Sequence, residues 1–213
     1  MLIDIFSDVI CPWCYIGKRR LEKGLAGLAP RPRIRWRAFL LNPDMPRDGM
    51  EREEYLARKF GTQARGRDLF AAVSQAGAGE GIRFAFDLIR RTPSTVDAHR
   101  LIATTDDDPA LQDRLVDTLF QAYFEEGADI GRTAVLLQVA ARAGLPGEET
   151  AAFLATDNGA DDVQADNALA HSLGITGVPC FVIDDKYAIS GAQAPEVFHR
   201  LFESLRQMEP ATA

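Results

Sequence analysis

The most reactive side chains in this sequence are two thiols that lie close together, in the segment Cys11-Pro12-Trp13-Cys14. A cysteine at the start of a helix is a good nucleophile, because unpaired backbone N–H groups and the helix dipole stabilise its thiolate. Cys14 follows three residues later, so it faces the same side of such a helix and can resolve a mixed disulfide formed by Cys11. The pair predicts reversible thiol–disulfide exchange.

Two other interpretations of the cysteine pair are half of a zinc site and a pair of inert, buried thiols. Structural zinc needs four ligands, and the chain offers one further cysteine, Cys180, and three scattered histidines. We therefore expect no metal site. Pro12 and Trp13 at a turn from strand to helix favour a partly exposed site over inert thiols.

A second signal lies far along the chain, where Gly174-Ile-Thr-Gly-Val-Pro179 precedes an apolar strand. Proline at that point predicts a cis peptide between Val178 and Pro179. Beside a CxxC helix, such a bend would expose the backbone N–H and C=O of Val178 to a substrate strand. The alternative is an ordinary proline at the start of a strand, and the distant cysteine pair favours the first interpretation.

The hydrophobic pattern of the first forty residues places the cysteines between a strand and a helix. Residues 2–7 predict a buried strand, residues 12–28 a helix, and residues 33–39 an alternating strand. Pro12 falls at the first position of the helix, where its missing N–H costs nothing. This order is a βαβ pattern, and a CxxC beside such a pattern indicates a redox motif. The basic residues of the helix, Lys18, Arg19, Arg20 and Lys23, are expected to form its solvated face.

Helical patterns dominate the chain after residue 42, and we expect strands to return only near its end. Those strands span residues 180–184 and 187–190, around a two-residue turn at Asp185-Lys186. The predicted helices span residues 51–60, 66–77, 95–106, 109–126, 131–143, 147–155, 160–173 and 195–207. We therefore predict one α/β domain, formed by residues 1–42 and 158–213, that is split by a large all-helical insertion at residues 43–157.

The composition argues against several classes of protein. The chain has 213 residues, of which 46% are hydrophobic and 26% charged, enough for a core without disulfide staples. Its net charge of −7 argues against nucleic acid as the main partner, since a phosphate backbone needs a basic surface. No stretch reaches the roughly 18 apolar residues of a membrane span.

The first eight residues lack the basic and apolar regions of a secretory signal, so we expect a cytoplasmic protein. The cytosol keeps thiols reduced, and a close cysteine pair in that compartment indicates redox chemistry or metal binding rather than a structural disulfide.

The two motifs together resemble the DsbA family of thioredoxin-like proteins. The resemblance rests on Ser7-Asp8-Val-Ile-Cys11-Pro-Trp-Cys14-Tyr-Ile-Gly17-Lys and on Gly177-Val178-Pro179. With the stretch Thr95-Val-Asp-Ala-His99-Arg-Leu101, the chain is most similar to the FrnE-type branch. That branch is itself similar to 2-hydroxychromene-2-carboxylate isomerases and kappa-class glutathione transferases. The resemblance implies a thioredoxin fold with a helical insertion, Cys11 as nucleophile, Cys14 as resolving thiol and Pro179 as the cis-proline.

The sequence departs from the pattern of such proteins at the position of a proton acceptor. Many thioredoxin-like proteins carry a buried acid six residues before the first cysteine, and here that residue is Ile5. Asp8 is a candidate substitute, and His99 is a candidate to face the site and favour a thiolate. Cys180, directly after Pro179, is either a small buried strand residue or a third thiol within reach of the pair.

Two functions follow from these residues. The first is a thiol–disulfide oxidoreductase without a required cofactor, acting on protein or small-molecule thiols and disulfides that contact Pro12, Trp13, Val178 and Pro179. The second is a glutathione-dependent isomerase or transferase for a small aromatic or polyketide-like molecule, in which Ser7 and the Gly177–Pro179 turn cradle glutathione as co-substrate. The intact Cys11 favours the first, because the relatives of the second kind often have serine there. A homodimer is one option for the assembly.

Overall fold

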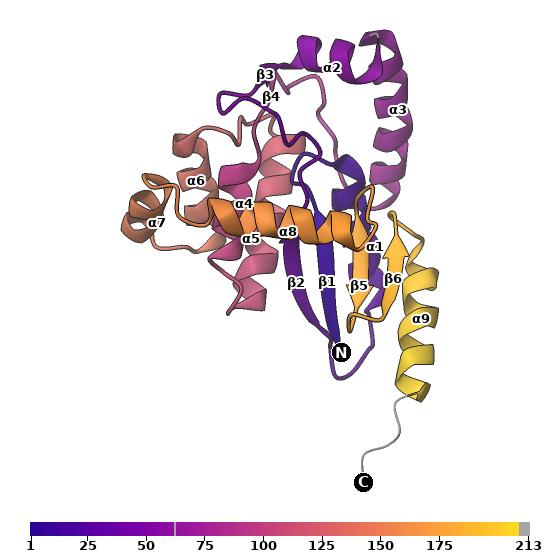
Figure 1. Ribbon diagram of the computed structural model, residues 1–213. Helices are drawn as coiled ribbons and strands as arrows, with labels where there is room; N and C mark the ends of the chain where they lie inside the picture. The colour runs from indigo at the N-terminus through magenta and orange to yellow at the C-terminus, as the bar shows by residue number, and fades with distance from the viewer. Residues whose placement is uncertain (62, 209–213) are drawn as a thin grey trace.

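The computed structural model describes residues 1–61 and 63–208, and its centre is a four-stranded mixed sheet in the order β2-β1-β5-β6 (Figure 1). Strand β1 (Leu2–Ser7) runs parallel to β2 (Arg33–Ala38) and antiparallel to β5 (Cys180–Ile183). Strand β6 (Tyr187–Ser190) completes the sheet beside β5. The two ends of the chain therefore meet in one sheet, as the thioredoxin-like prediction required.

Helix α1 (Pro12–Gly24) connects the parallel strands β1 and β2, and its first residue is the proline expected there. The helix ends at Gly24, before the predicted end at Leu28, because the chain turns back toward β2. Gly27 supports this turn with a positive φ of 81°, a conformation that glycine adopts at little cost.

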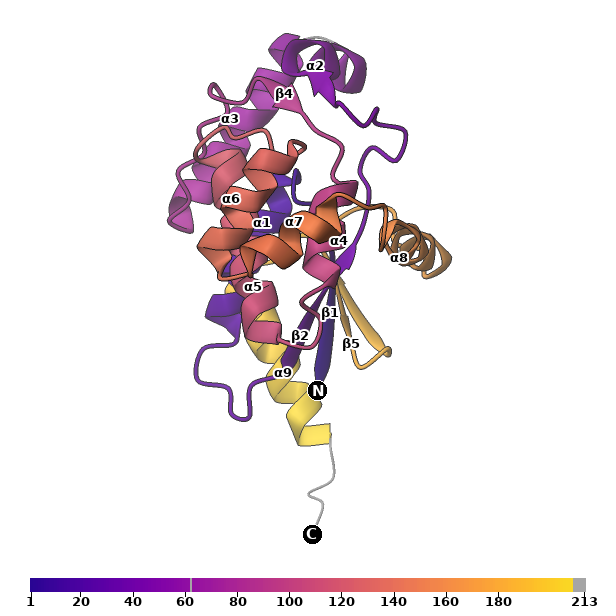
Figure 2. The same ribbon diagram turned by 90° about the vertical axis from the view of Figure 1, so that its left-hand side faces the viewer.

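Helices cover both faces of the sheet. Along β1 and β5 the side chains alternate, so that Ile5 and Phe181 pack with α1 and α9 (Pro195–Met208). Phe6 and Cys180 point to the opposite face and pack with Ala170 of α8 (Ala160–Ser172). Figure 1 shows α8 crossing in front of the strands, and Figure 2 shows the same helix from its end.

The insertion contributes six helices between β2 and α8 within the described part of the chain. They are α2 (Arg52–Phe60), α3 (Gln63–Gly79), α4 (Val96–Ala103), α5 (Pro109–Phe124), α6 (Thr133–Ala143) and α7 (Gly147–Leu154). Each matches a predicted helix with ends that differ by a few residues. Gly144 ends α6 in the left-handed conformation, as its position after Arg142 indicated.

Two predictions about the strands are wrong. A short antiparallel pair, β3 (Met50–Glu51) with β4 (Arg91–Thr92), lies inside the insertion, and two-residue strands are too short to show a hydrophobic alternation. The turn between β5 and β6 begins one residue earlier than predicted. Asp184 and Asp185 have φ values of 48° and 54°, a left-handed conformation that aspartate tolerates without glycine.

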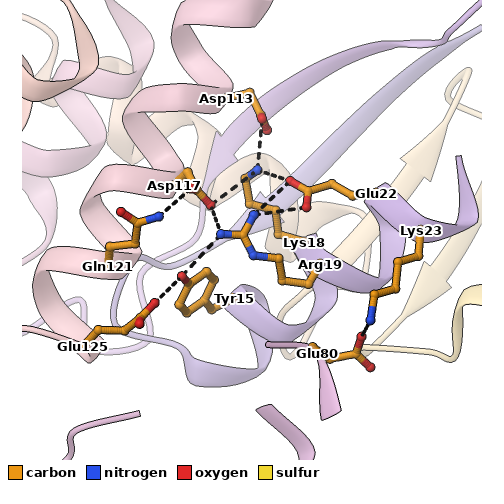
Figure 3. Close-up of polar contacts among 10 residues, drawn as sticks. All are labelled: Tyr15, Lys18, Arg19, Glu22, Lys23, Glu80, Asp113, Asp117, Gln121 and Glu125. Atoms are coloured by element: carbon orange, nitrogen blue, oxygen red, sulfur yellow. Dashed lines mark hydrogen bonds and ion pairs between the residues drawn. The ribbon is translucent and has the colours of Figure 1, made fainter. Parts of the chain in front are cut away.

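Helix α1 is fixed to the insertion by ion pairs, which corrects the prediction of a solvated basic face. Lys18 is only 2% exposed and contacts Glu22 of its own helix and Asp113 and Asp117 of α5 (Figure 3). Arg19 pairs with the same Asp117 at 2.7 Å. The positive charges of Lys18 and Arg19 are neutralised by carboxylates of α5, a helix about a hundred residues further along the chain. The local sequence of α1 does not indicate this contact. Across the part of the chain that the structure describes, no helix has the length and apolarity needed to cross a membrane.

Candidate active site

Cys11 lies immediately before the first turn of α1. Its backbone is extended (φ −92°, ψ 111°), and its C=O accepts from the N–H of Cys14 at 3.0 Å. The Cys11 side chain makes no capping hydrogen bond to the helix, so its thiol is not engaged by the backbone of α1. The Cys11 sulfur instead donates to the C=O of Val178 at 3.5 Å. The structure thus brings together the two motifs that the sequence places 167 residues apart.

The peptide bond between Val178 and Pro179 is cis, as predicted. The proline ring packs against α1 at Gly17. A methyl group at Gly17 would lie 2.8 Å from Cγ of Pro179 and 3.2 Å from Cζ of Phe181. Only glycine therefore allows the cysteine helix and the Pro179 loop to approach this closely.

We expect Gly17→Ala to push these two segments apart. The added methyl group meets a rigid ring, so the free energy of unfolding should fall by about 1–3 kcal/mol. The rate of disulfide exchange should fall with it, because the contact between Cys11 and Val178 loosens. Urea unfolding and a turnover assay measure both effects. Gly147→Ala is the matched control, since a methyl group at this helical glycine meets nothing within 4 Å; equal losses in the two variants would contradict the argument.

The two thiols are less exposed than the sequence suggested. Cys11 is 5% and Cys14 1% exposed, whereas Trp13 between them is 40% exposed. Pro12 is half-buried beside them. Trp13 is therefore the most accessible side chain of the motif. All three cysteines are free thiols in the structure.

Cys14 is held in its neutral form. Burial and the adjacent Cys11 sulfur raise the pKa of Cys14 well above its usual range. The Ser7 hydroxyl and the backbone N–H of Asp8 face the same sulfur and act in the opposite direction. Cys14 would have to lose this proton before it could act as a nucleophile.

The position that carries an acid in many thioredoxin-like proteins is apolar here, because Ile5 is fully buried in the core. The structure instead places Asp8 close to the cysteines, with no exposed surface. Its Oδ2 accepts from the N–H of Leu41 at 2.8 Å. Its Oδ1 lies 3.5 Å from Nε2 of His99, on α4 of the insertion. The two candidates that the sequence named separately are thus neighbours.

Cys180 lies on the other face of the sheet from the cysteine pair. Its side chain packs with Phe6, Phe39 and Ala170, while Cys11 and Cys14 belong to the cluster around α1. Burial raises the pKa of Cys180, which disfavours its thiolate. This arrangement favours a buried strand residue over a third redox thiol.

Two tyrosines of the insertion approach the site and were not predicted to do so. Tyr55 on α2 is half-buried, and its pKa is raised by burial and by the charges of Asp8 and Cys11, against the influence of Asn42 and Arg52. Burial likewise raises the pKa of Tyr123, which is 1% exposed in the core. Nothing in the local sequence around Tyr55 distinguishes it from an ordinary surface residue of a helix.

The described residues contain no group of three or more histidine, cysteine, aspartate or glutamate side chains that is arranged to hold a metal ion.

Comparisons with known proteins identify the family to which this fold belongs. The model of a family described as the DSBA-like thioredoxin domain matches residues 2–203. A probable DsbA oxidoreductase from Streptomyces coelicolor is 32% identical, with a TM-score of 0.88, over 100% of this chain and 93% of the other.

Two solved structures of lower identity share the fold. The cytosolic disulfide reductase DsbM from Pseudomonas aeruginosa, solved with GSH, is 18% identical, with a TM-score of 0.70 over 98% of this chain and 100% of that one. A 2-hydroxychromene-2-carboxylate isomerase is 15% identical, with a TM-score of 0.69 over 98% of this chain and 96% of that one.

Proposed function

Because the chain belongs to the family of DSBA-like thioredoxin domains, we propose that it is a thiol–disulfide oxidoreductase that works through Cys11 and Cys14. The contact between the Cys11 sulfur and the C=O of Val178 is the observation that carries the proposal. It joins a thiol at a helix start to a cis-proline loop that can hold an extended substrate.

The proposed reaction has two exchange steps. The Cys11 thiolate attacks one sulfur of a substrate disulfide, the substrate S–S bond breaks, and one substrate thiol leaves. The Cys14 thiolate then attacks the Cys11 sulfur of the mixed disulfide and releases the second substrate thiol. The substrate gains two electrons and two protons, and the enzyme ends with a Cys11–Cys14 disulfide. The reverse sequence oxidises a dithiol.

The two cysteines have unequal surroundings, which supports these unequal roles. Cys11 borders exposed Trp13 and the Val178 carbonyl, where a substrate has access. Cys14 is 1% exposed and protonated, so a substrate cannot reach it first. We propose protein or small-molecule disulfides as substrates and the cytoplasm as the compartment, in which the DsbM neighbour is also said to work.

Cys14→Ser should trap the mixed disulfide. Without the resolving thiol, the Cys11–substrate bond persists, because a serine hydroxyl cannot displace a thiolate from sulfur. Intact-mass spectrometry after incubation with oxidised glutathione or an oxidised peptide should show a stoichiometric adduct that a reductant removes. Wild type should release the adduct within the dead time. An absent adduct in a folded Cys14→Ser variant would reject Cys11 as the attacking thiol.

A glutathione-dependent isomerase is the second candidate, and one cavity favours it. A cavity of about 770 Å³ lies in the insertion between α2, α3 and residues 84–90, with Phe70, Phe84 and Phe86 on its wall. Arg52 also lines it, and its guanidinium lies 5.6 Å from the ring of Tyr55. The volume and the aromatic wall suit a small aromatic molecule.

Calorimetry with reduced glutathione separates the two candidates. Tight, saturable binding by a protein that shows no dithiol turnover supports the isomerase or transferase. Weak or absent binding together with turnover supports the oxidoreductase, with glutathione at most a co-substrate. The Cys14→Ser variant serves as the control, since it cannot form the internal disulfide and reports binding alone.

A further inference from the structure

Two buried polar side chains beside the cysteines, Asp8 and His99, take no part in the sulfur–sulfur bonds that form and break in the attack by Cys11 or in the attack by Cys14. Asp8 has no exposed surface and His99 is 4% exposed. The His99 Nε2 atom lies 3.5 Å from Oδ1 of Asp8 and has no hydrogen-bond partner among the described residues. Buried groups of this kind are costly unless they are paired, and here the only close partner of the imidazole nitrogen is a carboxylate.

Asp8 connects this pair to Cys14. Its backbone N–H and the hydroxyl of Ser7, the preceding residue, both face the Cys14 sulfur. The Ser7 Oγ has no hydrogen-bond partner among the nitrogen and oxygen atoms of the described chain. Its hydroxyl is therefore available to interact with the Cys14 sulfur. Oδ2 of Asp8 is engaged by the N–H of Leu41, which leaves Oδ1 directed at the N–H of Ile10 and at His99. Asp8 therefore contacts Cys14 through its backbone N–H, while its carboxylate is held by Leu41, by Ile10 and by His99 of the insertion.

His99 connects the pair to solvent. Its ring lines a cavity of about 390 Å³ between α4, β2 and α8, on the insertion side of the site. Asp162, at the rim of this cavity, is exposed, so water reaches the space beside the imidazole. Neither Trp13 nor Val178 lines this cavity.

We infer that Asp8 and His99 are the route by which the buried Cys14 thiol exchanges its proton with solvent during the second step. The inference rests on the proposed function, because only a resolving thiol must lose a proton there. As the Cys14 sulfur bonds to Cys11, its proton passes by way of Ser7 or one water molecule to Asp8, and His99 carries it to the cavity. The departing substrate thiolate takes up a proton from solvent, so the balance closes. His99 acts through Asp8 and is a positioning residue.

The charged groups around the pair are compatible with this role. His99 lies 3.5 Å from the Asp8 carboxylate, the Cys14 sulfur lies at the Asp8 backbone N–H, and the charge of Asp8 acts on Tyr55 and Tyr123. Facing His99 across the cavity are Arg37 of β2, Asp106 after α4, and Asp162 and Asp166 of α8. The acidic groups among these lining residues outnumber Arg37, so the solvent side of the cavity carries a net negative charge.

Single-turnover kinetics with dithiobis(nitrobenzoate) separates the two steps. With protein in excess, attack by Cys11 releases the first coloured thiolate, and attack by Cys14 releases the second. In His99→Gln the first phase should stay within about twofold of wild type, while the second should slow about tenfold or more at pH ~6.5. The deficit should shrink as the pH rises toward ~9, because hydroxide then removes the Cys14 proton without the pair.

Asp8→Asn is the second variant, because asparagine keeps an oxygen for the N–H of Leu41 but cannot accept the proton. The second phase of Asp8→Asn should be slowed with the same pH dependence as that of His99→Gln. The second phase of the variant that carries both substitutions should be no slower than that of Asp8→Asn alone, because the two residues act on one route. His199→Gln, on the exposed face of α9, is the matched control and should leave both phases unchanged.

A deficit that is equal in both phases, or constant across pH, would mean that Asp8 and His99 serve only the structure, and it would overturn the inference. A wild-type second phase that vanishes in Cys14→Ser confirms the proposed function separately. A wild type without two Cys11-dependent phases would reject that function, and this inference with it.

Discussion

Cys11→Ser is expected to abolish disulfide exchange while leaving the fold intact. Serine has nearly the size of cysteine, and it is among the preferred residues at the position before the first turn of a helix, which Cys11 occupies. Its hydroxyl does not ionise in the range where a thiol does and cannot attack a disulfide sulfur. The turnover rate should therefore fall by about a thousandfold or more, while the free energy of unfolding should be unchanged or slightly raised.

The reduction of insulin by dithiothreitol, followed by turbidity, measures this loss, and urea unfolding measures the stability. Cys180→Ala is the matched control, because it removes a buried thiol from the opposite face of the sheet. It should keep the turnover within about twofold of wild type and lose about 1 kcal/mol of stability through the missing sulfur. Full insulin reduction by Cys11→Ser would overturn the assignment of the nucleophile.

The sequence predicts the redox pair and its partner loop, because both are local patterns with a direct physical meaning. A CxxC between a strand and a helix needs no tertiary information, and a Val-Pro before an apolar strand carries its own backbone restriction. Their contact follows only from the resemblance to a known family, since no spacing rule joins Cys11 to Val178. The long, strongly periodic helices are also predicted, because their hydrophobic pattern is local. The predicted and observed helix ends differ by a few residues because helix termini fray.

The contacts that the sequence does not predict arise from packing between the sheet and the insertion. Lys18 has the pattern of an exposed residue on a basic face, yet α5 covers it with two carboxylates. Asp8 and His99 become a pair because α4 packs beside the turn after β1. Tyr55 reaches the electrostatic field of Cys11 from another helix of the insertion. Each of these contacts joins segments more than thirty residues apart, so the local pattern around either partner contains no trace of the other.

Lys18 provides the largest expected effect on stability. Its ammonium group is 2% exposed and lies 2.9 Å from Asp113 and 3.6 Å from Asp117, with Glu22 on the third side (Figure 3). Lys18→Met keeps the apolar stem but removes the cation that pairs with Asp113. Glu22 and Asp117 keep their ion pairs with Arg19. Removing one partner of a buried ion pair costs about 3–5 kcal/mol, and we expect about 2–3 kcal/mol here, since Asp113 and Glu22 are 40% exposed and partly solvated.

The loss should depend on pH in a defined direction. Burial alone would raise the pKa of Glu22, but attraction to Lys18 and Arg19 outweighs it and lowers that pKa below its ordinary value of 4.5. This contribution is present above pH 4.5 and is lost as the pH falls through the lowered value. Burial would lower the pKa of Lys18, but Asp113 and Glu22 raise it above 10.5, so its contribution is complete below that value and disappears at higher pH.

The difference in unfolding free energy between wild type and Lys18→Met should therefore be largest in the neutral range and should narrow on both sides. Urea unfolding at several pH values measures it. Lys23→Met is the matched control on the same helix, because Lys23 is 52% exposed and, among the described residues, forms an ion pair only with Glu80. The loss of stability in this variant should stay below about 1 kcal/mol. A difference that stays constant as the pH falls below 4.5 would contradict the assignment of the loss to the ion pairs that Lys18 makes with its carboxylates.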